Sequence, residues 1–304
     1  MVSDTATTSL HDRRAALAGI GLMTAGILLF AINDALGKWL VATYSVGQVL
    51  LIRSLAALVL LTPFIWRDRA SFKVAPRWGM QAWRAGLATA EVACFYWAVS
   101  YLPLADVMAY YLAGPIFVTA IAGAVLGEPI GWRRWTAVAV GFVGVVACLR
   151  PGSAALSWPA LIALAGSFTF SLSMISTRTL RGTSDTVLVT SQTVAALALG
   201  AVLAPVSWTP VSPRDGVLLA LLGMVAMTAH VCVNRSLKLA PASTVVPYQY
   251  TTIVWAVLFG YLVFGDVPDV WMLAGAAIII GAGLFIFLRE RALARRASFS
   301  EPPP

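Results

Sequence analysis

The sequence predicts an all-α integral membrane protein in which ten transmembrane helices form two inverted five-helix repeats. The first observation behind this prediction is the composition: 60% of the 304 residues are hydrophobic and 11% are charged, whereas soluble domains carry about 25% charged residues. The second is a series of apolar stretches of membrane-spanning length, and the third is a segment that returns in the second half. Most of the chain is therefore expected to lie in lipid.

Ten apolar stretches are long enough to cross the hydrocarbon core of a bilayer, which takes about 20 residues in a helix. They cover residues 19–40, 47–66, 80–101, 104–126, 133–150, 157–178, 186–205, 215–237, 243–264 and 269–289. The terminal segments are too polar to bury a core and are predicted to be mobile. The resulting division is a cytoplasmic segment over 1–16, repeats over 17–150 and 154–289, and a cytoplasmic tail over 290–304.

The repeated segment runs from Tyr101 to Glu128 and returns 138 residues later as Leu239 to Asp266. One gapless register aligns a proline, a tyrosine, a glycine and an acidic residue in the two copies. FAINDALGKWL in the first half likewise aligns with FSLSMISTRTL in the second. Because each half contributes five helices, an odd number, the second half must enter the membrane in the opposite orientation. Inverted repeats commonly place a site at the membrane midplane between the halves.

The basic residues predict the orientation, because cytoplasmic loops carry an excess of Lys and Arg. With the N-terminus inside, sixteen of the 21 basic residues fall in inner segments, and two, Arg150 and Arg214, fall in outer loops. We therefore expect a multi-pass protein of the bacterial inner membrane with both termini in the cytoplasm. The net charge of +8 reflects this distribution, so the lipid bilayer is the expected partner and nucleic acid is not.

No group of residues predicts an enzyme, a cofactor or a metal site. Cys94, Cys148 and Cys232 lie in apolar stretches without the spacing of metal ligands. Serine, histidine and acidic residues are not grouped as in a catalytic site, and the sequence has no phosphate-binding glycine loop. Catalysis is therefore not expected, and no ATPase subunit is evident.

Several short motifs carry a family resemblance. YLPLAD opens the fourth stretch, PIFV lies in its middle and LGEP ends it, while KLAPAS and FGDVP mark the second copy. Together with ten spans, these motifs resemble the EamA family of the drug/metabolite transporter superfamily over about residues 17–289. The resemblance implies transport of a small metabolite by alternating access, with helices 1, 3, 4, 6, 8 and 9 around a central cavity. NDALGKWL and GQVLLIRS also look like family members that take up S-adenosylmethionine.

The expected function is that of a secondary transporter for a small amphipathic organic metabolite, an amino acid or a similar compound. A proton or an exchanged metabolite would couple its movement. Uptake of S-adenosylmethionine or another cationic metabolite is the first alternative, because Glu91 and aromatic ring faces can hold a cation. A membrane scaffold or sensor without transport is the alternative from another class.

Charged residues within the apolar stretches are candidates for function, because each costs about 2.5–3.5 kcal/mol at the bilayer centre on insertion scales. Asp34 and Arg53 lie at similar depth in the first two helices, and Lys38 follows Asp34 by four residues on the same face. A structural cluster of Asp34 with Arg53 or Lys38 is the favoured interpretation. Binding of a substrate carboxylate and proton coupling are the alternatives.

Glu91 lies near the middle of the third helix with Phe95 on the same face. It is the leading candidate for a proton carrier or for a contact with a cationic group of the substrate, and a buried neutral acid is the alternative. In the eighth helix, Met227, His230 and Asn234 share a face at spacings of three and four. This pattern suits a proton relay, hydrogen bonding to substrate, or packing.

The repeated segments and two tryptophans supply the remaining candidates. Pro115 removes a helical hydrogen bond beside Gly114, so we expect a kink that either lines a cavity or serves packing. Glu128 and Asp266 end their segments before the next helix and are predicted to be helix-end caps. The other substrate-binding candidates are Trp97, Tyr110, Tyr111, Tyr248, Gln249, Tyr250, Thr252 and Trp255.

Overall fold

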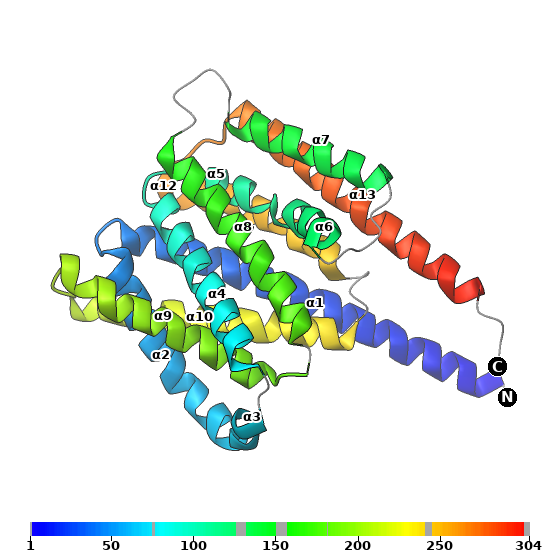
Figure 1. Cartoon of the computed structure of the whole chain (residues 1–304), viewed down its shortest axis with the longest axis horizontal. Coiled ribbons are helices and arrows are strands. Elements are labelled where there is room, and N and C mark those ends of the chain that lie inside the picture. The colour runs from blue at the N-terminus through cyan, green and yellow to red at the C-terminus, as the bar shows by residue number, and fades with distance from the viewer. Residues whose placement is uncertain are drawn as a thin grey trace.

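The computed structural model describes residues 2–74, 77–125, 132–149, 157–180, 182–240 and 245–300, and the regular structure in these residues is helical (Figure 1). The first half contains α1 (Val2–Val41), α2 (Val46–Arg67), α3 (Arg69–Val74), α4 (Trp78–Val99), α5 (Leu104–Tyr111), α6 (Gly114–Val125) and α7 (Trp132–Leu149). The second half contains α8 (Trp158–Thr179), α9 (Asp185–Leu203), η1 (Ala204–Ser207), α10 (Pro213–Leu239), η2 (Val246–Thr251), α12 (Thr252–Phe264) and α13 (Val270–Ser300).

Among the described residues, α1, α2, α8, α9, α10 and α13 are long and apolar enough to span a membrane. Shorter apolar helical pieces over 104–118, 135–148 and 248–264 coincide with three further predicted spans. The remaining span is α4, whose sequence is less apolar because it carries Gln81, Arg84 and Glu91. These helices confirm the predicted all-α integral membrane class.

The packing of the helices has the same pattern when the two halves are exchanged. α1 packs on α10 as α8 packs on α4, α2 contacts α10 as α9 contacts α4, and α6 contacts α8 as α12 contacts α1. The pairs α2 with α9 and α7 with α13 each join equivalent helices of the two halves, and α5 packs on α12 across the same boundary. One hydrophobic core therefore joins both halves, and it includes the fully buried Tyr96, Leu104, Leu222 and Ile279.

Both terminal helices are longer than the sequence predicted. α1 begins at Val2 and α13 continues to Ser300, so segments expected to be mobile continue the adjoining helices. A 40-residue helix such as α1 is about 60 Å long at 1.5 Å per residue, roughly twice the hydrocarbon thickness of a bilayer. The two ends project from the same side of the bundle (Figure 1), as expected for an even number of spans.

The fourth and ninth predicted spans are both interrupted, and at the same register of the repeat. α5 ends at Tyr111 and α6 begins at Gly114; 138 residues later, the 3-10 helix η2 gives way to α12 at Thr252. The Ser171 hydroxyl of α8 lies 3.0 Å from the carbonyl oxygen of Gly114 and 2.8 Å from that of Ser167. A hydroxyl of the neighbouring helix thus serves the interrupted backbone, which needs such partners at membrane depth.

Glycines allow α2 to approach α9 and α10 at backbone distance. A Cβ added at Gly200 of α9 would meet the backbone of Leu51, and one added at Gly223 of α10 would meet the carbonyl oxygen of Arg53. The wedged position of α2 between α9 and α10 therefore depends on the missing side chains.

We expect Gly223→Ala to lower the thermal stability of the purified protein. The added methyl group meets backbone rather than a flexible side chain, so α2 and α10 must move apart, at a cost of about 1–3 kcal/mol for overpacking. Gly86→Ala in α4 is the matched control, because a Cβ there meets nothing within 4 Å and alanine favours the helix by about 0.5–1 kcal/mol. Equal melting temperatures of the two variants would contradict this account of the packing.

Candidate functional site

The helices cross the bundle between two ends, which we name after residues placed there. The Lys38 end holds residues 42–45, 204–212 and 265–269. The Asp68 end holds residues 68–74 and 182–184.

An ion pair joins the two halves at the Lys38 end. Lys38 Nζ lies 2.6 Å from Asp266 Oδ2 and 4.5 Å from the ring centroid of Phe264, and the two charged side chains are only 15% and 25% exposed. The pair ties the last turn of α1 to the residues that follow α12. The sequence predicted Lys38 beside Asp34, but the structure turns Lys38 toward the other half of the chain.

Two further contacts close the Lys38 end. The Tyr44 hydroxyl donates to Asp215 Oδ2 at 2.7 Å, and the Gln48 side chain makes hydrogen bonds of 2.7 and 3.0 Å with the backbone of Thr209. The hydrogen bond to the Asp215 carboxylate raises the pKa of the Tyr44 hydroxyl. The start of α2 is thereby fixed to α10 and to the segment before it.

The helix-end caps differ from those that the sequence predicted. Asp266 gives its carboxylate to Lys38, and the first turn of α13 is instead capped by Asp269, whose Oδ2 accepts a hydrogen bond of 2.8 Å from the Trp271 amide. Gly265 ends α12 in the left-handed conformation at φ +70°, which favours glycine. Glu128, the other predicted cap, lies outside the described residues.

At the Asp68 end, one carboxylate joins the first half to the second. Asp68 accepts hydrogen bonds from the Ser71 hydroxyl at 2.5 Å and from the Ser184 hydroxyl. Ser184 also caps α9 by accepting from the Thr186 amide at 3.2 Å. These hydrogen bonds, that of Ser184 first, hold the pKa of the Asp68 carboxyl below its usual value.

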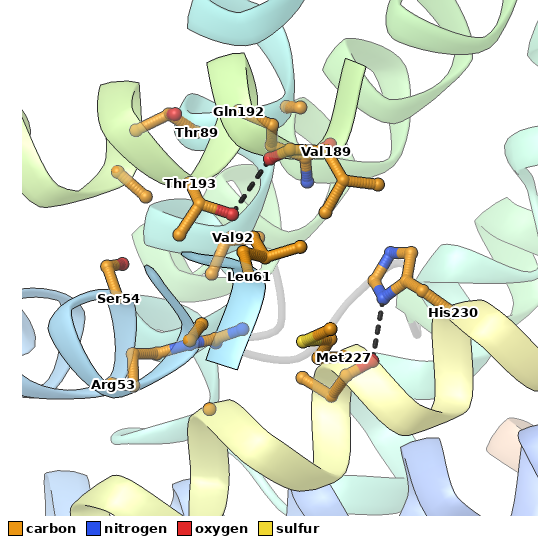
Figure 2. Close-up of a pocket in the computed structure, with 15 residues that line it drawn as sticks. Arg53, Ser54, Leu61, Thr89, Val92, Val189, Gln192, Thr193, Met227 and His230 are labelled. Atoms are coloured by element: carbon orange, nitrogen blue, oxygen red, sulfur yellow. Dashed lines mark hydrogen bonds between the residues drawn. The ribbon is translucent and has the colours of Figure 1, made fainter. Parts of the chain in front are cut away.

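A pocket with both polar and apolar lining lies between these ends, enclosed by α2 and α4 of the first half and α9 and α10 of the second (Figure 2). It is lined by Arg53, Ser54, Ala57, Leu61, Ala88, Thr89, Val92, Val189, Gln192, Thr193, Ala196, Gly223, Ala226, Met227 and His230. Its volume is about 60 Å³. The family resemblance implied a cavity among six helices that include α4 and α10, whereas this pocket adds α2 and α9 to those two.

Arg53 extends from α2 into the pocket (Figure 2) and is held by an aromatic residue rather than by an acid. Its guanidinium donates to the Tyr96 hydroxyl and lies 5.3 Å from the Tyr96 ring centroid. Asp34 accepts a hydrogen bond of 3.2 Å from its neighbour Asn33 and lies within electrostatic range of Arg53, although the pair is not in ion-pair contact. Asp34, Lys38 and Arg53 therefore do not form one ion-paired cluster: Lys38 pairs with Asp266 and Arg53 contacts Tyr96.

Glu91 lies beside this charged region. Its half-buried carboxylate has no hydrogen-bond or ion-pair partner in the part of the chain that the structure describes, and Asp34 and Arg53 are within its electrostatic range. The Tyr111 hydroxyl donates to the Glu91 carbonyl at 3.1 Å, and the Phe95 ring packs edge-on against Tyr111 at 5.7 Å. The structure thus brings together the main candidates of helices 1, 2, 3 and 4.

His230 reaches the pocket from α10 (Figure 2). Its Nδ1 lies 2.8 Å from the carbonyl oxygen of Ala226, and because a carbonyl only accepts, Nδ1 must carry a proton. In the neutral ring, Nε2 can then accept a hydrogen bond. The ring packs edge-on against Phe30 at 4.8 Å, and Met227 lines the same pocket.

Two predicted tyrosines turn away from the pocket. The Tyr110 hydroxyl donates to the carbonyl oxygen of Cys148 in α7 at 3.4 Å. The Tyr250 hydroxyl packs against Gly283 of α13, where an added Cβ would clash with it. Both side chains therefore anchor the interrupted spans to the α7–α13 pair.

Other predicted residues also lie outside the pocket lining. Trp97 and Tyr248 are exposed, Trp255 stacks on Phe259 with centroids 6.3 Å apart, and Gly114 is buried against Phe170. Gln249 and Thr252 are half-buried, and the side chains of Pro115 and Asn234 are not described.

The sequence interpretation gave no role to Arg84, Thr89, Gln192 or Thr193. Thr89, Gln192 and Thr193 line the pocket, and Arg84 lies behind it with its Nη2 3.4 Å from Gln192 Oε1. Their polarity inside the apolar stretches 80–101 and 186–205 was the available signal. It was weak because threonine and glutamine are common in helices, and the position of Arg84 in its span did not reveal its neighbours.

Two halves with matching packing, built from membrane-spanning helices around an internal pocket, are the architecture expected of a membrane transporter. Residues 17–150 and 157–288 match the model of the EamA-like transporter family, so the chain belongs to that family. This membership makes it a secondary transporter of small metabolites rather than an enzyme.

Characterised relatives resemble the chain over nearly its whole length. It is 26% identical to a riboflavin transporter of Rhizobium johnstonii, with 93% of this chain and 94% of the relative covered. The chain is 26% identical to an S-adenosylmethionine uptake transporter of Rickettsia felis, with 90% of this chain and 94% of the relative covered. It is 24% identical to a pseudopaline exporter of Pseudomonas aeruginosa, with 86% of this chain and 96% of the relative covered. A crystal structure with 17% identity shares the fold at a TM-score of 0.62, over 92% of this chain and 99% of the other.

Proposed function

We propose that the protein moves a small amphipathic organic metabolite, an amino acid or a similar compound, across the bacterial inner membrane by alternating access. The observation that carries this proposal is the pocket that α2 and α4 of one half share with α9 and α10 of the other. In inverted-repeat transporters, rocking of one half against the other exposes such a site to each side in turn.

The size of the pocket supports a moving mechanism. Its volume of about 60 Å³ suits a few water molecules, whereas pockets for organic ligands measure about 300–1,000 Å³. The halves must therefore separate to admit a metabolite. The ion pair of Lys38 with Asp266 at one end and the hydrogen bond of Ser184 to Asp68 at the other both join the two halves, so they are among the contacts that would break in turn.

Charges of both signs support an amino-acid-like substrate. The Arg53 guanidinium suits a carboxylate, and the Glu91 carboxylate, which has no hydrogen-bond partner in the described residues, is a candidate to contact an ammonium group or to carry the coupled proton. Phe30, Phe95 and Tyr111 offer apolar surface nearby for the remainder of the molecule. S-adenosylmethionine or another cationic metabolite is the second candidate, favoured by the similarity to transporters named for its uptake.

The test is counterflow in liposomes that contain the purified protein, with a panel of amino acids, S-adenosylmethionine and riboflavin. We expect an unlabelled substrate inside the vesicles to accelerate entry of the same labelled compound, and empty liposomes are the control. A compound that raises the melting temperature of the protein but shows no counterflow would favour a sensor over a transporter.

We further propose that the Asp68 end faces the cytoplasm, because the inner segments carry most of the basic residues. A cysteine introduced at exposed Arg69 should then be protected from a membrane-impermeant maleimide in intact cells, whereas one at exposed Val267 should react. The native Cys94, Cys148 and Cys232 are replaced by alanine in both variants. The reverse labelling pattern would invert the proposed orientation.

A further inference from the structure

The pocket has an uneven charge balance. Arg53 and His230 line it, and Arg84 lies directly behind Gln192, but no aspartate or glutamate is among its lining residues. Both guanidinium groups lie within electrostatic range of His230. The charge on the pocket lining is therefore positive, while Asp34 and Glu91 lie outside the lining and within electrostatic range of Arg53.

Arg84 is a buried cation with only neutral partners in the described residues. It is 8% exposed, and its guanidinium donates to Thr177 Oγ1 at 2.8 Å, the Leu188 carbonyl at 3.1 Å and Gln192 Oε1 at 3.4 Å. Burying a charge without a counter-ion is costly. An anion that approaches the pocket would lower this cost.

Unused hydrogen-bond donors face the same space. Gln192 turns its Oε1 toward Arg84, which leaves the donating Nε2 group for another partner. Thr89 lines the pocket and is 4% exposed, and its buried hydroxyl has no hydrogen-bond partner among the described residues, so a rotation of the side chain can present it to the pocket. In Figure 2, Thr89 and Gln192 approach the pocket from one side and Arg53 from the other. A buried polar group of this kind calls for a partner.

We propose that this pocket binds an anionic oxygen group of the transported molecule, a carboxylate or a phosphate, through the Arg53 guanidinium and the Thr89 hydroxyl. Arg84 adds positive charge from behind Gln192 and acts as a positioning residue. A volume of about 60 Å³ suits such a head group rather than a whole metabolite. The guanidinium of Arg53 uses one donor on Tyr96 and keeps others for the planar oxygens of the anion. This inference rests on the proposed transport function.

The test measures thermal unfolding of the purified full-length protein while sodium acetate or sodium phosphate replaces sodium chloride at constant ionic strength and pH. At least one of the two anions should raise the melting temperature in a saturable way. The anion that does so distinguishes a carboxylate from a phosphate. An equal melting temperature in all three salts would overturn the proposal.

Variants then locate the binding. Thr89→Val should weaken anion affinity about three- to tenfold, the loss expected for one hydrogen bond, without destabilising the anion-free protein, because its hydroxyl has no partner to lose. Arg53→Gln should weaken affinity at least about tenfold. Thr228→Val, whose hydroxyl bonds its own helix at the Met224 carbonyl outside the pocket, is the matched control. If Arg53→Gln does not fold, the anion affinity of Thr89→Val alone tests the proposal: an affinity equal to that of the unchanged protein would contradict it.

The outcome is separable from that of the transport proposal. Saturable stabilisation by an anion without flux of any substrate would contradict transport and leave the anion subsite in place. Flux that is unchanged in both Thr89→Val and Arg53→Gln would contradict the subsite and leave transport in place.

Discussion

Replacing Glu91 with glutamine should abolish accumulation of substrate driven by a proton gradient while substrate exchange at equal pH continues. Glutamine keeps the shape of the side chain but cannot gain or lose a proton. The carboxylate has no hydrogen-bond partner in the described residues, and a charged group in the membrane is costly enough that it is expected to serve a function. In proteoliposomes, we expect gradient-driven uptake to fall at least about tenfold, which corresponds to 1.4 kcal/mol.

Asp34→Asn is the comparison variant, because Asp34 already accepts a hydrogen bond from Asn33. It should retain more of the gradient-driven uptake than Glu91→Gln, with exchange measured in both variants to show that the protein is folded. Normal accumulation by Glu91→Gln, at wild-type pH dependence, would remove Glu91 from the coupling mechanism. Loss of both accumulation and exchange would instead indicate a role in substrate binding.

Replacing Asp266 with asparagine should favour opening of the protein at the Lys38 end, and this is the second large effect that we expect. The Lys38–Asp266 contact is a charge-assisted hydrogen bond of 2.6 Å between largely buried side chains, and such bonds contribute about 1.5–3 kcal/mol. Its loss should therefore shift the balance toward the state open at this end by about 10- to 100-fold. Spin labels at the exposed positions Thr43 and Val267 should show an added population at longer distance.

The matched control is Asp269→Asn, which removes a carboxylate charge at the start of α13, keeps an oxygen that can accept from the Trp271 amide, and leaves the Lys38–Asp266 pair intact. It should keep the distance distribution of the unchanged protein. The exchanged pair Lys38→Asp with Asp266→Lys should restore the short distance at least in part. An unchanged distribution in Asp266→Asn would show that the ion pair does not hold this end closed.

Much of the architecture could be predicted because it depends on local composition. Hydrophobic length located the spans, and the copy of Tyr101–Glu128 at Leu239–Asp266 revealed two related halves. Gly114 and Pro115 also marked the place where the fourth span is interrupted. The 3-10 helix η2 was harder to foresee, because the proline in it, Pro247, occupies a different position from Pro115 in the repeat.

The side-chain contacts could not be predicted in the same way. Lys38 has a plausible partner four residues before it, yet its partner in the fold is Asp266, 228 residues away. Tyr110 and Tyr250 lie in predicted spans that carry only a few polar residues, so the sequence could not tell that one meets α7 and the other α13. Such choices depend on how distant helices pack, which no local pattern encodes.

The matched interruptions in the fourth and ninth spans have a consequence for the direction of transport. Each half is interrupted at the same place, between α5 and α6 in one and between η2 and α12 in the other, so we expect that either half could supply a hinge. With equivalent hinges in both halves, the conformational change would be reversible, and neither half would impose one direction of transport. For a secondary transporter, import or export depends on the gradients across the membrane, so we expect the same molecule to run in either sense when those gradients change sign.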